Sequence, residues 1–404
     1  MKMIFSLIVI LICIVSGCSC KKEEPVKTSI FSSYIIGYLN KEGTSYTLVE
    51  PFGTYIGFVG YNEQKVNELQ DLLNEEVFKY HSLLDRNYYY KDSKGNLINN
   101  IKIINDSYGS GASIEVDEII IDALKEGVKY TKLSNGRFNI ISGSIVDVWD
   151  ERFTSYDTSI RNVDPTSEEI EEAMKCVAPV NDIDNILVID DVNNKITFNS
   201  FNSCIGQASI TLGAMAKSYF LDKMAQIDEF IDIGASIYDA GQSSIIIRGN
   251  NPTRDGGVWN IAVNDSMNSN SFVSTQAAQL QLAGDNAIST SGIQHRGYIN
   301  SDGIIRHHII DATSGYPNTY LVGATVIGES AMMVDIVTTT LMTMNSIEEI
   351  KTYLTLLENN NVSLDVLLQV KVDDGIKLLV NDTMQDQVLQ VFNDIELEVF
   401  NYGA

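Results

Sequence analysis

The spacing of apolar residues along this chain predicts strands and helices in mixed order. Runs in which every second residue is apolar are typical of half-buried strands, and runs with apolar residues three and four apart are typical of helices. Because these runs follow one another without a regular strand–helix–strand period, we expect an α+β fold rather than a doubly wound α/β fold. Strands are expected over residues 46–60, 230–248 and 258–263, and helices over residues 63–84, 116–133, 331–344 and 347–357, with short strands after the last helix.

The predicted helix over residues 331–344 is almost entirely apolar but contains one carboxylate, Asp335. A buried carboxylate is costly unless a cation neutralises it. Thr339 lies one turn later on the same helix face, so both residues could offer oxygen atoms to one hard metal ion. An Asp paired with a neighbouring Arg, or an Asp at the mouth of a cleft, explains the pattern equally well. The residue types alone leave these explanations open.

The N-terminus is typical of a bacterial lipoprotein. Lys2 is followed by an apolar run that is too short for a membrane span and that ends in V-S-G-C, which resembles a lipobox. An ordinary secretory signal with a chance cysteine is the alternative. The lipobox predicts a signal peptide over residues 1–17, a lipidated Cys18 with a tether over residues 18–45, and one domain over residues 46–404, held at the extracytoplasmic face of the cell membrane.

Charge and cysteine usage narrow the possible partners. A formal net charge of −25 and an isoelectric point near 4.4 argue against nucleic-acid binding, which needs a positive surface. The same charge argues against adhesion to anionic lipid, so membrane attachment would depend on the lipid anchor. With four histidines in the chain, any metal is expected to be oxygen-liganded, such as Mg²⁺. Apart from the cysteines near the N-terminus, the chain has Cys176 and Cys204. A disulfide between these two is compatible with the sequence, which does not determine it.

Two glycine-bearing stretches could approach a ligand. Residues 134–139 read S-N-G-R-F-N, and residues 211–219 read T-L-G-A-M-A-K-S-Y and open a predicted helix. Small residues at the start of a helix let backbone amides approach an anion, and Lys217 could add a positive charge there. Each stretch alone is more typical of simple packing, and neither has the spacing of a dinucleotide-binding or P-loop motif.

Taken in order, these stretches resemble the ApbE family, the FAD:protein FMN transferases. The resemblance covers residue 52 to the C-terminus and implies a T-fold-like α+β architecture of layered antiparallel sheets with packed helices. The similar segments are F-G-T at 52–54 to M-G-T, 135–149 to N-G-x-F-D-P-T-x-G-P-L-x-x-x-W, 211–219 to D-L-G-G-I-A-K-G-Y, 232–241 to N-A-G-G-D-I-x-x-x-G, 289–292 to A-T-S-G, 308–317 to H-I-L-D-P-R-T-G-Y-P, and 331–339 to A-x-x-A-D-A-L-S-T.

The resemblance implies a magnesium-dependent reaction in which FAD is the substrate. FMN would be transferred from FAD to a Thr or Ser hydroxyl of a partner protein, and AMP would be released. The expected partner is an extracytoplasmic redox protein with an S/T-G-A-T target. Some relatives let water attack instead, which makes them FAD pyrophosphatases.

The resemblance also implies roles for particular residues. It places Mg²⁺ on Asp335, Thr339 and the backbone carbonyl of Ala214, with Thr338 nearby. His308 would be the general base, since an imidazole suits that task near neutral pH; a strand histidine satisfied by a backbone carbonyl is the alternative. Flavin contacts are expected from Phe52, Phe138, Asn139, Ile140, Thr211, Lys217 and the backbone of Ile310.

The chain departs from the family pattern mainly on the nucleotide side. Thr211 stands at a family Asp, Asn139 and Ile140 replace Asp-Pro, and Ser218 replaces a Gly. Ile233, Ala235 and Ser236 depart from A-G-G-D, so that Ser236 stands where a second family acid is missing. These departures leave open a third hypothesis, a non-catalytic flavin-binding lipoprotein. The segment V-G-A-T at 322–325 resembles a flavinylation target, but its first hydroxyl residue is replaced by Val and we expect it to be an interior strand.

Overall fold

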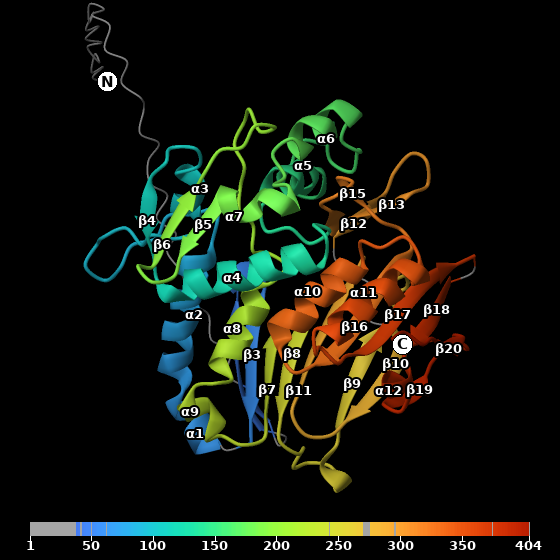
Figure 1. The fold of residues 1–404 in the computed structure, drawn as a ribbon. Coiled ribbons are helices and arrows are strands. Elements are labelled where there is room, and N and C mark those ends of the chain that lie inside the picture. Colours follow the sequence, from blue (N-terminus) through green and yellow to red (C-terminus); the bar gives the residue numbers. More distant parts are fainter. Residues whose placement is uncertain are drawn as a thin grey trace, which may run out of the picture.

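The chain folds into a large central sheet with helices on one face and a smaller sheet on the other (Figure 1). Cys18, Cys20 and the predicted signal peptide lie outside the residues described here. The computed structural model describes residues 38–40, 43–49, 51–61, 63–241, 243–269, 275–294, 296–373 and 375–403. None of the helices in these ranges is long and apolar enough to cross a membrane.

The main sheet has ten strands within the described residues, in the order β1-β2-β3-β7-β8-β11-β16-β17-β18-β20. All neighbours in this sheet are antiparallel except β18 and β20. The strands are β1 Tyr38–Asn40, β2 Gly43–Val49, β3 Tyr55–Gly60, β7 Ser236–Ala240, β8 Ser244–Arg248, β11 Asn286–Gly292, β16 Leu321–Gly328, β17 Asp365–Val372, β18 Gly375–Val380 and β20 Leu397–Val399.

Amphipathic helices cover one face of this sheet and enclose the larger core. The central helix α10 packs on β11 and β16 and against α8, so it is buried on almost all sides. Phe220 of α8 and Leu341 of α10 are both fully buried in this core. The covering helices are α1 Glu63–Glu68, α2 Gln70–Leu84, α4 Glu118–Leu133, α8 Ala216–Met224, α9 Asp228–Ile231, α10 Ala331–Leu341 and α11 Ile347–Asn359.

A second core lies on the opposite face of the sheet. There a three-stranded sheet, β19-β10-β9, packs its apolar residues against the strands around β11 and β16. Trp259 and Ile288 are both buried in this core. The elements are β9 Trp259–Asn264, β10 Gln276–Leu282, β19 Val388–Val391, α12 Asp382–Gln385 and the 3-10 turn η3 Asp255–Gly257.

A third group of short elements rises beyond the end of α10 (Figure 1). Its small core is formed by Ile145, Trp149, Ile170 and Tyr298. The elements of this group are α5 Gly143–Thr154, α6 Ser167–Met174, β12 Gly297–Ile299, β13 Ile305–His307, β14 Ile310–Asp311 and β15 Tyr316–Pro317.

The remaining short elements lie at the edge of the larger core, to which most of them contribute apolar residues. They are η1 Pro51–Gly53, α3 Ile101–Asp106, β4 Ser113–Glu115, η2 Val180–Asp182, α7 Ile183–Ile186, β5 Leu187–Asp190 and β6 Lys195–Phe198.

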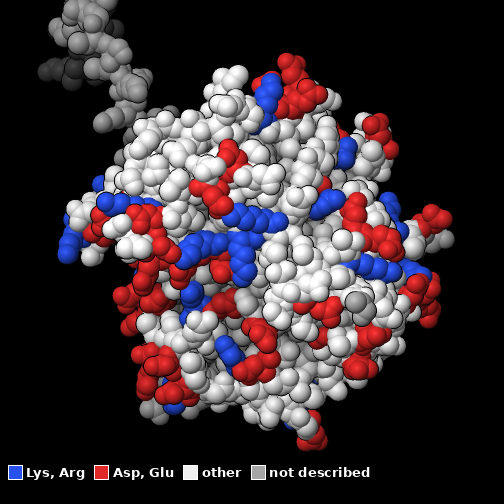
Figure 2. Space-filling view, viewed as in Figure 1, with Lys and Arg blue, Asp and Glu red and all other residues white. Residues whose placement is uncertain are grey.

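Charged residues of both signs are mixed over the face shown in Figure 2, which carries the surface of α4. Lys125 and Lys132 of α4 pair with Asp191 and Asp184 at 2.7 and 2.6 Å. A cleft of about 860 Å³ lies beside them, between α4, α8 and the start of α10. Its wall includes Arg248, which pairs with Asp285 at 3.0 Å. Lys125 and Arg248, which both line the cleft, are therefore each paired with an acid.

The predicted α+β class is confirmed, with two local corrections. The helix expected over residues 63–84 is two helices, because the backbone turns at Leu69, whose side chain is buried. A strand over residues 230–235 is wrong: Phe230 lies in the short helix α9, and the hairpin begins only at Ser236. The predicted interior strand over residues 322–325 is confirmed as part of β16, and Thr325 is fully buried.

Candidate functional site

Helix α10 is fixed at its N-terminus by a carboxylate from α8. Asp222 accepts hydrogen bonds from the Ser330 hydroxyl at 2.7 Å and from the amides of Ala331 and Met332 at 2.8 and 2.9 Å. Burial raises the pKa of Asp222, and these hydrogen bonds partly offset that shift. A negative charge at this end also complements the helix dipole. The start of α10 is therefore locked to α8.

The opposite end of α10 is held by a guanidinium. Arg137 donates to the backbone carbonyl of Thr343 at 2.7 Å, to Asp311 at 2.9 Å and to Glu349 at 2.9 Å. A cation near the last carbonyls of a helix is favourable for the same dipole. Because Asp311 follows the segment that carries His308, Arg137 joins that segment to α10.

Asp335 lies in the middle of α10 and is 3 % exposed, with partners for both carboxylate oxygens. One oxygen accepts from the ammonium of Lys217 and from the hydroxyl of Ser218 at 2.8 Å. The other lies 3.0 Å from the Ser289 hydroxyl, whose single hydrogen can go to this oxygen or to the Ser243 carbonyl at 2.9 Å. The structure thus brings together Asp335 and Lys217, which the sequence assigned to different tasks. The partner of Asp335 is a Lys and not the Arg of the alternative explanation.

Alternate residues of β11 extend this cluster along α10. In a strand, residues two apart point to the same face, so Ser289 and Ser291 both face the helix. Ser291 donates to the Thr338 hydroxyl at 2.9 Å, and Thr338 donates to the backbone carbonyl of Asp335 at 2.9 Å. Thr290, on the other face, pairs with Thr325. The result is a row of hydroxyl groups beside one buried carboxylate.

The atoms around Asp335 suit a hard cation by their chemistry. Carboxylate, hydroxyl and carbonyl oxygens are the ligands that Mg²⁺ accepts, and Asp335, Thr338 and Thr339 supply the first two kinds on one helix. Ala214, whose carbonyl is the predicted third ligand, lies two residues before α8. No group of three or more His, Cys, Asp or Glu residues within the described ranges could hold a metal. A cation here would share Asp335 with Lys217.

Phe52, a predicted flavin contact, lies in the turn η1 before β3. Its backbone amide donates to Nδ1 of His81 at 3.1 Å, and its ring stacks on Phe220 of α8 with a centroid distance of 5.7 Å. Phe220 is three residues after Lys217, and residues three apart share a helix face. Phe52 therefore lies next to the helix face that carries Lys217.

The predicted flavin contacts around residue 139 are largely buried. Phe138 and Ile140 belong to the main core. The Asn139 side chain donates to the carbonyl of Ala178 at 2.9 Å and accepts from the amide of Ile141 at 2.9 Å. Thr211 donates its amide to the carbonyl of Ile140 at 2.8 Å, which aligns the two predicted stretches. Any contact from Asn139 to a ligand would thus come from its backbone, and these assignments stay predictions.

His308, the predicted base, follows β13 and is exposed, whereas its neighbour His307 is fully buried. The Nδ1 atom of His308 lies 3.3 Å from the carbonyl of Arg296. His307 donates from Nε2 to the carbonyl of Asn318 at 2.6 Å, and burial lowers the pKa of His307 to about 4. Asn318 in turn donates to the Thr343 carbonyl at 3.2 Å, so the histidine segment is tied to the end of α10. Ile310, the predicted backbone contact, opens β14 two residues later.

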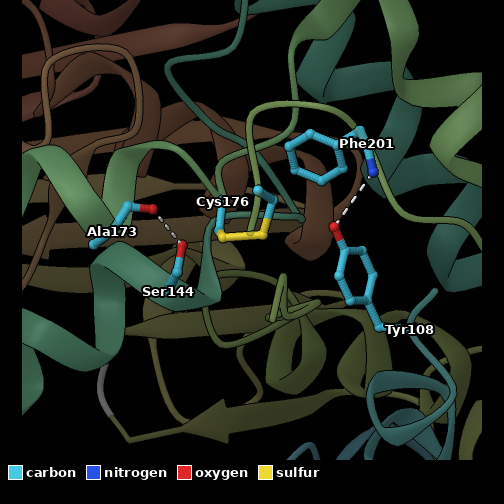
Figure 3. The surroundings of a disulfide bond; sticks show 6 residues. Tyr108, Ser144, Ala173, Cys176 and Phe201 are labelled. Atoms are coloured by element: carbon cyan, nitrogen blue, oxygen red, sulfur yellow. Dashed lines mark hydrogen bonds between the residues drawn. A yellow bond between two sulfur atoms is a disulfide. The ribbon is translucent and has the colours of Figure 1, made fainter. Parts of the chain in front are cut away.

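A disulfide joins Cys176 and Cys204, the pair that the sequence left undetermined (Figure 3). Their Cα atoms are 4.4 Å apart, and both residues are buried. On one side Ser144 donates to the carbonyl of Ala173 at 2.9 Å, and on the other the Phe201 amide donates to the Tyr108 hydroxyl at 3.4 Å. The bond holds the loop before residue 211 against the segment that follows α6.

The sequence does not identify Ser289 and Ser218 as partners of Asp335, although each stands out in it. Ser289 belongs to a run of small hydroxyl residues, and the period of two in β11 places it on the face of Ser291. Ser218 looks only like a departure from a family glycine. Its hydroxyl nevertheless reaches Asp335, because α8 and α10 pack side by side.

These features define a class of layered α+β protein in which a buried helix carries one carboxylate. That helix packs between a strand that supplies hydroxyl groups and a helix that supplies a lysine. The chain belongs to the ApbE family, whose model matches residues 52–365. It is 28 % identical over 338 residues to the FAD:protein FMN transferase of Vibrio cholerae serotype O1, covering 83 % of this chain and 87 % of that protein.

Solved structures show the same fold. The ApbE protein from Thermotoga maritima superimposes with a TM-score of 0.64 and 22 % identity, covering 89 % of this chain and 100 % of that one. The flavin transferase ApbE from Vibrio cholerae gives a TM-score of 0.61 at 23 % identity, covering 88 % and 99 %. The predicted layered arrangement is confirmed by these neighbours.

Proposed function

We propose that this protein transfers FMN from FAD to a Thr or Ser hydroxyl of an extracytoplasmic partner protein and releases AMP. The observation that carries the proposal is the buried Asp335 cluster, with Lys217 beside it and with the segment of His308 joined to the end of the same helix through His307 and Asn318. Family membership and the names of the relatives support the reaction class. The partner is expected to carry an S/T-G-A-T target.

The cluster would bind the negatively charged pyrophosphate of FAD. Asp335, Thr339 and the Ala214 carbonyl would hold Mg²⁺, with Thr338 nearby, and the bound ion would neutralise pyrophosphate charge. Lys217 is 16 % exposed at its side chain, so it can reach an anion while it remains paired with Asp335. Because α10 is fixed at both ends, these groups need little reorganisation when FAD binds.

His308 would accept the proton of the attacking hydroxyl. A backbone carbonyl can only accept, so the hydrogen on Nδ1 of His308 faces Arg296 and the neutral ring keeps its lone pair on Nε2. In the proposed step the acceptor oxygen forms a bond to the FMN phosphorus, the bond from that phosphorus to the AMP oxygen breaks, and the hydroxyl proton moves to Nε2. AMP leaves with the electron pair of the broken bond.

The exposure of His308 favours a second candidate function. Water can reach an exposed imidazole as readily as a protein hydroxyl can, and attack by water would give FMN and AMP. In that case the protein would be an FAD pyrophosphatase that uses the same residues.

We further propose that the protein is lipid-anchored through Cys18 at the extracytoplasmic face. The support is the lipobox-like sequence V-S-G-C and the Cys176–Cys204 disulfide. Disulfides persist mainly in oxidising compartments and are rare in the cytosol.

The decisive experiment incubates the purified chain with FAD and Mg²⁺, with and without a protein that carries the S/T-G-A-T target. A mass increase of one FMN on the target residue, with AMP released, is the expected result. AMP and free FMN without modification of the target would indicate the pyrophosphatase. Recovery of intact FAD would contradict both reactions and leave a flavin carrier.

A further inference from the structure

Phe52 has a backbone conformation that a residue with a side chain rarely adopts. Its φ and ψ angles are 56° and 23°, in the left-handed region. A non-glycine residue in this region is strained, so a specific contact must hold it. The neighbouring Gly53 is also left-handed, with a φ of 71°. The turn therefore depends on what its backbone touches.

His81 of α2 supplies that contact. The Phe52 amide donates to Nδ1 of His81 at 3.1 Å, and the two rings meet edge to face with a centroid distance of 5.3 Å. Because an amide N–H can only donate, Nδ1 must accept, and the proton of the neutral ring is on Nε2. Burial lowers the pKa of His81, while Asp85 acts in the opposite direction.

The far side of the His81 ring is supported by a second pair of groups. Nε2 of His81 lies 3.1 Å from the Tyr90 hydroxyl, so it donates to that oxygen. Tyr90 in turn donates to Asp85 at 2.7 Å. This chain of donors fixes both the orientation and the tautomer of the ring, which keeps Nδ1 facing Phe52.

The Phe52 ring is thereby placed against helix α8, which also carries Lys217 of the Asp335 cluster. It stacks on Phe220, which lies one helical turn after Lys217 on α8. Lys217 is paired with Asp335, so one helix joins the ring to the cluster. Phe52 is itself only partly buried, and its ring can therefore form a wall of a flavin pocket.

We propose that His81 is a positioning residue: it holds the Phe52 backbone in the left-handed conformation and so sets the aromatic wall against which the flavin binds. This proposal rests on the proposed function, because it assigns the FAD site to the side of α8 that faces Phe52. His81 does not touch the reacting atoms. Its effect should therefore appear in FAD binding rather than in the chemical step.

Two substitutions distinguish the roles of the two ring nitrogens of His81. His81→Asn places an oxygen near the position of Nδ1, so it keeps the acceptor for Phe52 and loses the donor to Tyr90. His81→Gln places its amide nitrogen near the position of Nε2, so it keeps that donor and loses the acceptor. We expect His81→Gln to raise the KM for FAD about ten-fold with kcat changed less than about two-fold, and His81→Asn to stay within about three-fold of the wild type.

Hydrogen–deuterium exchange at the Phe52 amide gives a second readout that does not need turnover. The amide should exchange faster in His81→Gln and should stay protected in His81→Asn, with thermal midpoints confirming that both variants fold. An equal rise in KM for both variants, or a wild-type KM in His81→Gln, would overturn the proposal. If the wild type neither binds nor converts FAD, the proposed function fails. Unchanged Phe52 exchange in His81→Gln would show separately that His81 does not hold the turn.

Discussion

The two ends of the proposed site differ in how far the protein itself satisfies their polar groups. Both oxygens of Asp335 accept hydrogen bonds, and the residue is 3 % exposed. His308, in contrast, is exposed, with the Arg296 carbonyl at 3.3 Å from its ring. A buried, saturated carboxylate is suited to hold charge in one place. An exposed imidazole is suited to meet a group that arrives from another molecule.

The largest effect is expected from Asp335→Ala. It should lower FAD turnover by about 1000-fold or more, because it removes the charge on which the cluster is built. It should also lower the free energy of unfolding by about 3 kcal/mol, since Lys217 would lose the partner of a buried pair. AMP release and urea unfolding measure the two effects.

Asp335→Asn is the matched control, because it keeps the volume of the side chain and its acceptor for Ser289. If its turnover also collapses while stability is less affected, the charge is what catalysis needs. Wild-type turnover in Asp335→Ala would remove Asp335 from the proposed site.

His308→Ala should lower the rate of transfer and leave the stability of the fold almost unchanged. We expect kcat for transfer to fall about 100-fold, because a general base contributes about that much or more. The free energy of unfolding should change by less than about 0.5 kcal/mol, since the side chain is exposed. Single-turnover transfer and urea unfolding would test this, with the water reaction followed in parallel. Unchanged kcat would show that another group accepts the proton.

The next prediction concerns His307, which is buried beside the exposed His308. Because folding lowers its pKa from 6.5 to about 4, the unfolded chain binds the proton more tightly. The stability from neutral His307 is therefore fully present above pH 6.5 and is lost as the pH falls towards 4. The loss amounts to about 3 kcal/mol at most, from the size of the shift.

His307→Gln removes this titration and should flatten the pH dependence of urea unfolding between pH 4 and 6.5. Asp222 acts in the opposite sense, because its raised pKa favours the folded state as the pH falls, so only the difference between wild type and variant reports on His307. Parallel curves for the two proteins would contradict the prediction.

The spacing of apolar residues in the sequence correctly predicted helices that bury one regular apolar face or are apolar throughout. The apolar repeat of α10 and the Asn135-Gly136 stop after α4 both agree with the structure, where Asn135 and Gly136 have φ angles of 51° and 86°. The break at Leu69 escaped prediction, because it depends on tertiary packing: α1 packs on β2 and β3, whereas α2 packs on α4 and α8.

The site was predicted in parts rather than as a cluster. Asp335 and Lys217 were both singled out, but their pairing joins residues 118 positions apart and depends on the packing of α8 against α10. The Cys176–Cys204 bond likewise needed the fold, because cysteine counts leave its partners open. Asn139 shows the limit of resemblance, since its side chain is occupied by Ala178 and Ile141.

The smallest effect is expected at Ser218. It tests how much the hydrogen bond from Ser218 to the Asp335 carboxylate contributes. The Ser218 hydroxyl is fully buried, and its single hydrogen can go to Asp335 at 2.8 Å or to the Met215 carbonyl at 3.0 Å. Ser218→Ala should cost about 1 kcal/mol of unfolding free energy, because Asp335 loses one donor but keeps Lys217.

Ser82→Ala is the control, because Ser82 is a similarly buried helix serine whose hydroxyl donates only to the Lys79 carbonyl of its own helix. It should cost less than about 0.5 kcal/mol. Since Ser218→Ala also frees a lone pair on Asp335, the Mg²⁺ concentration needed for half-maximal turnover should fall by about two-fold or more. An unchanged Mg²⁺ requirement, together with equal stability losses in the two variants, would mean that Ser218 only packs and that Asp335 is held by Lys217 and Ser289 alone.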